Sequence, residues 1–264
     1  DQVRILRAHF DATTEVADKI ALLLRQAAIC ETRLDRSKEA LEALAEVLYL
    51  QPAHPRAVAE LRRMFDEGKH RERILEMIEP IYLDTAAFTD LATVYESSLG
   101  AIEDPDRRKE TLLKLADVWM TKLGDGAAAM GWFGKALAID PADESLLIQV
   151  EMLAQETSGW QALLDILLAA ASATGDDGRR VQLWHKAVDC AKDRLGDFQR
   201  AEAVCRWILD VDAGDATALA VLDGMFENQE RYADLTEPLN ALHASYPELS
   251  DHELEATLFL FYAI

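Results

Sequence analysis

Three stretches of this sequence repeat one pattern, and the repetition limits what the chain can fold into. The stretches are Leu34–Pro52 (LDRSKEALEALAEVLYLQP), Leu123–Pro141 (LGDGAAAMGWFGKALAIDP) and Leu195–Ala213 (LGDFQRAEAVCRWILDVDA). Each begins with a turn, continues with a small residue and an apolar stripe, and ends with acidic residues or proline. Self-similarity at a long period is the signature of repeat architectures. We therefore expect an array of structural repeats.

The period of the repetition is 72 residues, and the first repeat is longer. Leu123 and Leu195 are 72 residues apart. The same spacing separates three aromatic residues, Phe88, Trp160 and Tyr232. Leu34 and Leu123 are instead 89 residues apart, a surplus of 17. We place the surplus at His70–Thr85 and predict one extra helix there, which Pro80 kinks or ends early.

Apolar residues flank each turn at helical spacing. Before the turn they recur at i, i+4, i+7 and i+11: Leu23, Ala27, Cys30 and Leu34, then Leu112, Ala116, Trp119 and Leu123, then Trp184, Val188, Ala191 and Leu195. A second stripe with the same period follows each turn. Every stripe predicts an amphipathic helix with one wet face. Because the turns are short, the paired helices are antiparallel neighbours, and Ala40, Ala129 and Ala201 let their backbones approach.

Further helices are predicted after each pair, and no β-alternation of useful length occurs. One set comprises Pro55–Glu67, Ala142–Glu156 and Asp215–Asn228, and the next comprises Phe88–Leu99, Trp160–Ala173 and Tyr232–Ser245. Asp104 and Asp176 are predicted N-caps, with Pro105 in the favoured first helical position. Ser250 and Glu253 form a capping box before a last helix.

These helices predict an all-α fold, a right-handed α-solenoid of antiparallel helical hairpins with roughly 14–15 helices. We treat 1–264 as one helical-repeat segment. Residues 1–18 end a preceding repeat, 19–108 form a first repeat with the extra helix, 109–179 a second, 180–249 a third, and 250–264 begin another. Neither terminal helix has the polar face that closes most solenoids. We therefore expect a longer array, or ends that another chain covers.

Charge and cysteine content limit the classes of function that we expect for this chain. The chain has 48 acidic and 27 basic residues, a net charge of −21, which repels nucleic-acid phosphates and anionic lipids. Three cysteines without CxxC spacing argue against a disulfide framework and favour a reducing compartment. We expect a cytoplasmic protein, although a cleaved leader stays open. No run of 18 apolar residues occurs, which predicts no membrane span.

The sequence offers no convergent set of catalytic or metal-binding residues. His252–Glu253 begins an HExxH-like string, but Ala256 stands where the second zinc ligand would be. Gly134–Lys135 lacks the upstream glycine of a phosphate-binding loop. Cys30 and Cys205 share columns with core residues and are interpreted as buried, inert thiols. We therefore predict no enzyme activity, no metal and no cofactor within this chain.

The second hairpin resembles a tetratricopeptide repeat. Its first helix has the family's large, large, small and aromatic residues, Leu112, Leu115, Ala116 and Trp119. Its second helix has the family's small, aromatic, small and proline residues, Ala129, Phe133, Ala136 and Pro141. The other two repeats match less well, and the turn is one residue longer than the family's. The resemblance implies an α-solenoid that binds a peptide or partner protein in a concave groove, without catalysis.

The resemblance also implies which side chains line that groove, namely first-helix residues that flank the apolar stripe. Carried over by position, the candidates are Glu31 in the first repeat, Glu110, Asp117 and Met120 in the second, and Gln182, His185, Asp189 and Lys192 in the third. Ala21, Leu24, Ala28 and Thr32 share this face with Glu31. Lys192 is the only formally basic candidate, so the basic clamp that holds carboxylates in some members is absent. We expect a basic or amphipathic partner segment; the alternative is a solvated face.

Three functions are compatible with this sequence. The first is a non-catalytic scaffold that binds a partner protein or peptide through an acidic concave groove. The second is a structural subunit that docks, or self-associates, through its uncapped terminal helices. The third is a regulatory arm of an enzyme whose catalytic domain lies outside this chain.

Overall fold

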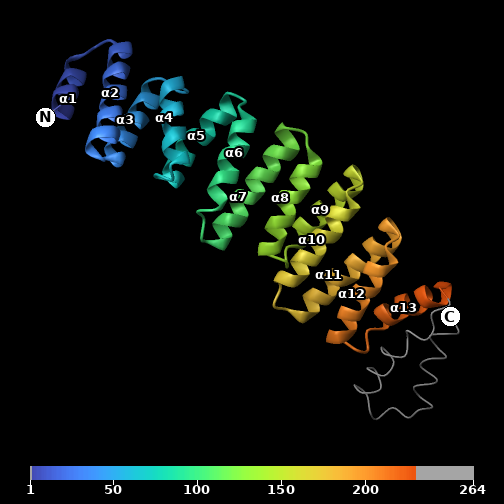
Figure 1. Ribbon diagram of the computed structural model, residues 1–264. Coiled ribbons are helices and arrows are strands. Elements are labelled where there is room, and N and C mark those ends of the chain that lie inside the picture. The colour runs from blue at the N-terminus through green and yellow to red at the C-terminus, as the bar shows by residue number, and fades with distance from the viewer. Residues whose placement is uncertain (1, 230–264) are drawn as a thin grey trace. The chain divides into compact units, whose positions relative to one another are not determined.

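The computed structural model of the protein describes residues 2–229 and is all-α, as predicted (Figure 1). Thirteen α-helices and no strand lie in these residues. The chain divides into two compact units, Asp1–Glu103 and Asp104–Ile264, here called the N-terminal unit and the C-terminal unit. The predicted helix Tyr232–Ser245, the capping box at Ser250 and the HExxH-like string lie outside the described residues.

The N-terminal unit contains six helices. They are α1 (Gln2–Ala12), α2 (Val16–Leu34), α3 (Ser37–Leu50), α4 (Pro55–Asp66), α5 (Arg71–Asp84) and α6 (Phe88–Leu99). Successive helices contact one another along the unit. The apolar stripes of α2 and α3 meet, and Leu23, Cys30, Ala40 and Val47 are all buried there. Leu34, the last residue of its stripe, lies in the last turn of α2 and is 42% exposed.

The extra helix predicted at His70–Thr85 is confirmed as α5. Pro80 does not end it early, because the helix continues to Asp84. Ile74, Ile78 and Tyr82 are buried on one side of α5, whereas Pro80 is exposed. Packing of the apolar stripe therefore outweighs the loss of one backbone donor at this proline.

The C-terminal unit places its helices in two layers. The first layer comprises α7 (Pro105–Asp117), α9 (Glu144–Thr157) and α11 (Asp177–Asp189). The second layer comprises α8 (Gly126–Ile139), α10 (Trp160–Ala173) and α12 (Phe198–Val211). Helix α13 (Ala216–Gln229) follows α12 in the chain. Each first-layer helix packs on the second-layer helix that follows it, and α8 packs on α10. Between the layers lie buried apolar residues such as Leu115, Phe133, Leu147 and Leu183.

One turn geometry recurs in all three hairpins. A residue in the left-handed region follows the first helix: Asp35 (φ 52°), Gly124 (φ 70°) and Gly196 (φ 64°). The next amide then donates to the carbonyl six residues back, over 2.9, 2.9 and 2.8 Å for the pairs Arg36–Cys30, Asp125–Trp119 and Asp197–Ala191. This bond satisfies a carbonyl that the helix end would leave unpaired.

The repeated turns of the C-terminal unit begin inside the helix, in a widened last turn. The last turns of the first helices in the C-terminal unit are π-helical: η1 (Val118–Lys122) after α7 and η2 (Cys190–Leu195) after α11. The amide of Leu123 donates to the carbonyl of Val118, five residues back, over 3.0 Å. A wider turn absorbs one extra residue without breaking the helix.

Aspartates cap most helices of the C-terminal unit. The carboxylates of Asp104, Asp125, Asp143, Asp176, Asp197 and Asp215 accept from backbone amides at the starts of α7, α8, α9, α11, α12 and α13, at 2.8 to 3.0 Å for the shorter bond of each. The predicted caps Asp104 and Asp176 are thereby confirmed, with Pro105 opening α7. Six carboxylates of this acidic chain are therefore used to begin helices.

Gly134 sets how closely α8 and α10 pack. A methyl group at this position would lie 2.5 Å from Cγ1 of Ile166, which is closer than van der Waals contact allows. Gly131 lies three residues earlier on α8, where an added methyl group meets nothing within 4 Å. The two glycines therefore offer the same substitution in a close contact and in open space.

We predict that Gly134→Ala lowers the free energy of unfolding by about 1–3 kcal/mol, because it overpacks the α8–α10 contact. Gly131→Ala should raise it by about 0.5–1 kcal/mol, because alanine loses less backbone entropy in a helix. Urea denaturation followed by circular dichroism measures both. Ile166→Ala should recover part of the loss in the Gly134→Ala background. Equal effects of the two single substitutions would contradict the assigned contact.

Candidate functional site

Two surfaces hold the residues that the sequence predicted, one in each unit. In the C-terminal unit, Glu110 and Asp117 lie on α7, Met120 in η1, Gln182, His185 and Asp189 on α11, and Lys192 in η2. The first-layer helices that present them are joined by polar side chains. Lys109 of α7 binds Asp140 and Asp143, and Lys186 of α11 binds Glu151 of α9 at 2.7 Å.

Helix α9 lies between α7 and α11 and presents an apolar pair to solvent. Gln149 on one side donates to the sulfur of Met120 over 3.9 Å, and Glu151 on the other side accepts from Lys186. Ile148 and Met152 are 53% and 58% exposed. Their helical positions fall between Gln149 and Glu151 and opposite the buried stripe of α9. They therefore point out of the first layer, away from the second.

Asp117 and Asp189 occupy the corresponding outward positions on the flanking helices. Each lies on its helix opposite the buried residues, and both are exposed. Neither carboxylate forms an ion pair with any described residue. We call Asp117, Ile148, Met152 and Asp189 the outer face of the C-terminal unit: an apolar centre on α9 with an unpaired carboxylate on the helix to each side.

The other predicted residues of this unit have partners within it. Glu110 pairs with Lys114 at 3.4 Å, Lys192 with Asp193 at 3.5 Å, and His185 Nε2 with Asp215 Oδ2 at 2.9 Å. Gln182 accepts from Arg179 over 3.2 Å. Sequence reasoning missed Ile148 and Met152 because it drew candidates only from the helices before the repeated turns. The signal was present, as two large apolar residues four apart on the wet side of Ala142–Glu156.

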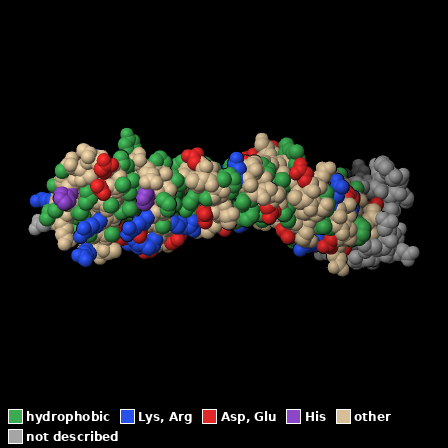
Figure 2. Space-filling view, turned by 90° about the horizontal axis from the view of Figure 1, so that it is seen from above, with side chains coloured by type: hydrophobic (Ala, Val, Ile, Leu, Met, Phe, Trp, Pro, Cys, Tyr) green, Lys and Arg blue, Asp and Glu red, His purple; other side chains and the backbone are tan. Residues whose placement is uncertain are grey.

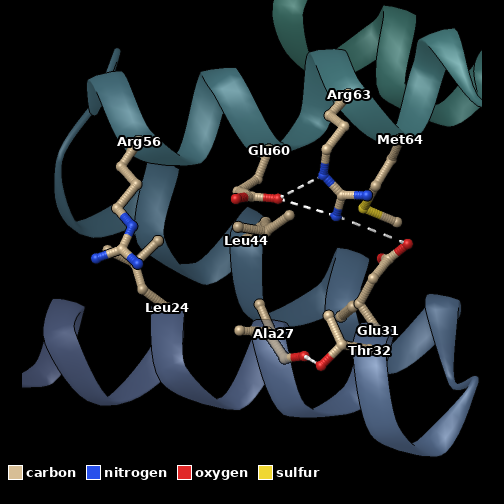
Figure 3. Close-up of a pocket in the computed structure, with 11 residues that line it drawn as sticks. Leu24, Ala27, Glu31, Thr32, Leu44, Arg56, Glu60, Arg63 and Met64 are labelled. Atoms are coloured by element: carbon tan, nitrogen blue, oxygen red, sulfur yellow. Dashed lines mark hydrogen bonds and ion pairs between the residues drawn. The ribbon is translucent and has the colours of Figure 1, made fainter.

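The second surface is a cavity in the N-terminal unit, between α2 and α4 and above α3 (Figure 3). Its volume is about 190 Å³. Leu24, Leu44 and Met64 form its apolar wall, and each is at most 9% exposed. Ala28 lines both this cavity and a more open hollow that continues along α2 toward Ala17. Together they make a groove along α2, here called the α2–α4 groove.

Glu31 is the predicted residue that lines this cavity. Its side chain is 6% exposed, so it is a buried carboxylate rather than an exposed groove acid. Oε1 accepts from Lys69 Nζ at 2.6 Å and lies 3.9 Å from Arg63 Nη2. Ala21, Leu24, Ala28 and Thr32 also line the groove, as their position on the predicted face implied. The opposite wall, formed by α4, was not predicted, although Arg56, Glu60 and Arg63 recur at helical spacing.

Basic side chains gather on the N-terminal unit. Figure 2 shows Lys and Arg clustered over the N-terminal elements on the face in view. Residues 1–103 contain 13 of the 27 basic residues but only 19 of the 48 acidic ones. The negative charge of the chain is therefore concentrated in the sequence of the C-terminal unit, and the two surfaces differ in electrostatic character.

The cysteines are buried and have no catalytic arrangement. Burial raises the pKa of the Cys205 thiol to about 12, and it also raises the pKa values of the Cys30 and Cys190 thiols. Cys190 Sγ donates to the carbonyl of Trp160 over 3.3 Å, and His185 faces Asp215 instead. The prediction that Cys30 and Cys205 are buried is confirmed.

The described residues also limit other assignments. Within 2–229, His, Cys, Asp and Glu side chains nowhere gather in threes in a way that would hold a metal ion. None of the helices in the same range is long and apolar enough to cross a membrane.

Comparison with known proteins finds a partial similarity. No model of a known protein family matches the chain. A 92-residue part, 35% of the chain, is 26% identical to an aminopeptidase N of Haemonchus contortus. The match spans 9% of that protein. The tetratricopeptide-like character of the repeats therefore stays a prediction.

Lys109 and Asp143 provide a test of the contacts that hold the first layer together. Hydrogen bonds to Asp140 and Asp143 raise the pKa of Lys109, and the bond from Lys109 lowers the pKa of Asp143. A carboxyl whose folded pKa is lowered stabilises the fold above its unfolded pKa, near 3.9, and loses that contribution as pH falls through the folded pKa.

We predict that Asp143→Asn, which keeps an acceptor for the α9 cap, lowers the free energy of unfolding by about 1 kcal/mol at pH 7. The difference from wild type should disappear as pH falls through the lowered folded pKa of Asp143, because the carboxyl is then protonated. Denaturant unfolding between pH 2 and pH 7 measures it. Asp125→Asn is the control, since Asp125 caps α8 and pairs with no lysine in the part of the chain that the structure describes. A pH-independent difference at Asp143 would contradict the ion pair.

The thiols give a second test. We predict that none of the three reacts with Ellman's reagent at pH 8 in the native protein, because buried thiols with raised pKa values stay protonated. All three should react within minutes in denaturant. Rapid reaction of one native thiol would show that its site opens or that its pKa is not raised.

Proposed function

We propose that this protein is a non-catalytic scaffold whose C-terminal unit binds a basic, amphipathic segment of another protein at the outer face. The observation that supports the proposal most is the exposed pair Ile148 and Met152, flanked by the unpaired carboxylates Asp117 and Asp189. Exposed large apolar residues are costly to solvate and mark interaction sites when they are rimmed by polar groups.

The chemistry of the outer face suits one kind of segment. Apolar side chains of a docked helix would cover Ile148 and Met152, which supplies most of the affinity through burial of nonpolar area. Lysine or arginine side chains on its margins would pair with Asp117 and Asp189. Such exposed charges contribute more to association rate and specificity than to affinity, and salt screens them. We propose a reducing, cytoplasmic location for this interaction, since the three thiols are unpaired.

A designed amphipathic helix of leucine and lysine, labelled with fluorescein, tests the proposal by fluorescence anisotropy. The double substitution Asp117→Lys with Asp189→Lys should raise Kd at least about tenfold at low salt and flatten its salt dependence. Ile148→Ser with Met152→Ser should raise Kd by a similar factor and leave the salt dependence intact, because it removes apolar contact only.

Asp210→Lys on α12 is the matched control, since it reverses an exposed charge of the second layer. It should change Kd less than about twofold. If Asp210→Lys weakens binding as much as the outer-face charge reversals, the helix responds to net charge alone and the outer face is not the site.

The partial similarity to aminopeptidase N supports a second candidate, a helical arm of a larger peptidase. The test is an aminopeptidase assay, with aminoacyl p-nitroanilides, on the full-length protein from its native source. Chelator-sensitive activity of the full-length protein, together with inactivity of the 1–264 chain, would favour this candidate over the scaffold.

A further inference from the structure

The α2–α4 groove has features that an ordinary solvent-exposed surface lacks. Helices α2 and α4 line the groove together with an apolar wall. Ala27 and Ala28 have small side chains, and they leave open a space that larger side chains would fill. Figure 3 shows Glu31 and Arg63 at one end of the cavity and Arg56 at the other, with Leu44 between them. The groove belongs to the N-terminal unit alone, so a ligand bound in it would be independent of the outer face.

One carboxylate oxygen in the groove has no partner. Glu31 Oε1 binds Lys69, but Oε2 is buried without a donor among the described residues. A buried acceptor that is left unpaired is costly, and a buried charge more so. A donor from outside the chain would remove this penalty, and a cation would do so best.

At the Glu31 end of the groove, negatively charged groups outnumber positively charged ones by one. Arg63 is paired with Glu60 at 3.0 Å and with Glu67 at 2.5 Å, and Lys69 is paired with Glu67 at 2.9 Å as well as with Glu31. Three carboxylates, Glu31, Glu60 and Glu67, therefore face two basic groups. One additional ammonium would balance them.

The other end of the groove is basic. Arg56 extends from α4 over Leu24 (Figure 3), and its guanidinium makes no hydrogen bond or ion pair with a described residue. Arg25 and His54 line the hollow that continues from this end. Leu24 and Glu31 are seven residues apart on α2, which places the two ends about 10 Å apart.

Helix dipoles act in the same direction as these charges. Glu31 and Arg63 lie near the C-terminal ends of α2 and α4, where the partial charge is negative and cations are favoured. Arg56 lies in the first turn of α4, where the partial charge is positive. The groove is therefore anionic at one end and cationic at the other.

We propose that the α2–α4 groove binds an extended peptide segment of a partner protein by a lysine and an acidic residue three positions apart. The lysine ammonium donates to Glu31 Oε2, and its methylene stem lies against Leu44. The acidic side chain pairs with Arg56. In a polyproline II conformation three residues advance about 9 Å and bring the side chain back to the same side of the segment, so both charged side chains can face the groove. A compact ammonium suits a single free acceptor better than a planar guanidinium does.

Two fluorescein-labelled peptides test this, acetyl-Leu-Lys-Ala-Ala-Glu-Leu-amide and its sequence reversal, because the chain direction is open. Anisotropy titrations use the 1–264 chain. One peptide should bind, and Glu31→Gln should weaken it at least about tenfold. Replacing the peptide lysine by norleucine should weaken wild-type binding as much, with no further loss in the Glu31→Gln variant. Arg56→Ala should lose its effect when the peptide glutamate becomes glutamine.

Two further variants separate binding from folding. Glu76→Gln is the control, because Glu76 is an exposed carboxylate of the same unit that pairs with Arg73 and does not line the cavity; it should leave the affinity within about twofold. Ala28→Leu should abolish binding by filling the groove without changing charge, while circular dichroism and Tm stay native.

Failure of both peptides to bind, or equal affinity for wild type and Glu31→Gln, would overturn the proposal and assign Glu31 Oε2 to bound water. Ile148→Ser with Met152→Ser should not affect these peptides. A result at one surface can therefore be told from a result at the other.

Discussion

The reversal of the chain after each first helix is the constraint on which the rest of the structure depends. A left-handed residue and a backbone bond to the carbonyl six residues back turn the chain within a few residues. Two apolar stripes then face each other, and small residues such as Ala129 and Ala201 let the helices approach until both are buried. The two glycines at this turn, Gly124 and Gly196, adopt the conformation without a side-chain penalty, whereas Asp35 does so at a cost.

The acidic residues of this chain have more than one role in the structure, so the net charge does not show how many of them are free to bind a partner. Six aspartates begin helices of the C-terminal unit, and Asp140, Asp143 and Glu151 pair with lysines across the first layer. Those carboxylates stabilise the fold and are not free for a ligand. Asp117 and Asp189 differ because they are exposed and unpaired beside Ile148 and Met152. Net charge alone therefore overstates the acidic surface that a partner meets.

The two units offer different binding chemistry. The outer face is exposed apolar area with carboxylates beside it, which suits a helix with one apolar side and basic margins. The α2–α4 groove is enclosed, holds a buried carboxylate and has opposite charges at its ends, which suits a short extended segment in one direction. A scaffold with both surfaces would distinguish partners by shape as well as by charge.

The sequence by itself determined the all-α class, the hairpins, the helix at α5 and the caps at Asp104 and Asp176, because helical periodicity and capping are local. The six described helices for which bounds were predicted begin and end within two residues of those positions. The burial of Glu31 and the opposite wall of its groove depended on α4, which packs beside α2 only after the chain has passed through α3. The exposure of Ile148 was likewise decided by tertiary structure, since only the packing of α9 between its neighbours determines which side faces solvent.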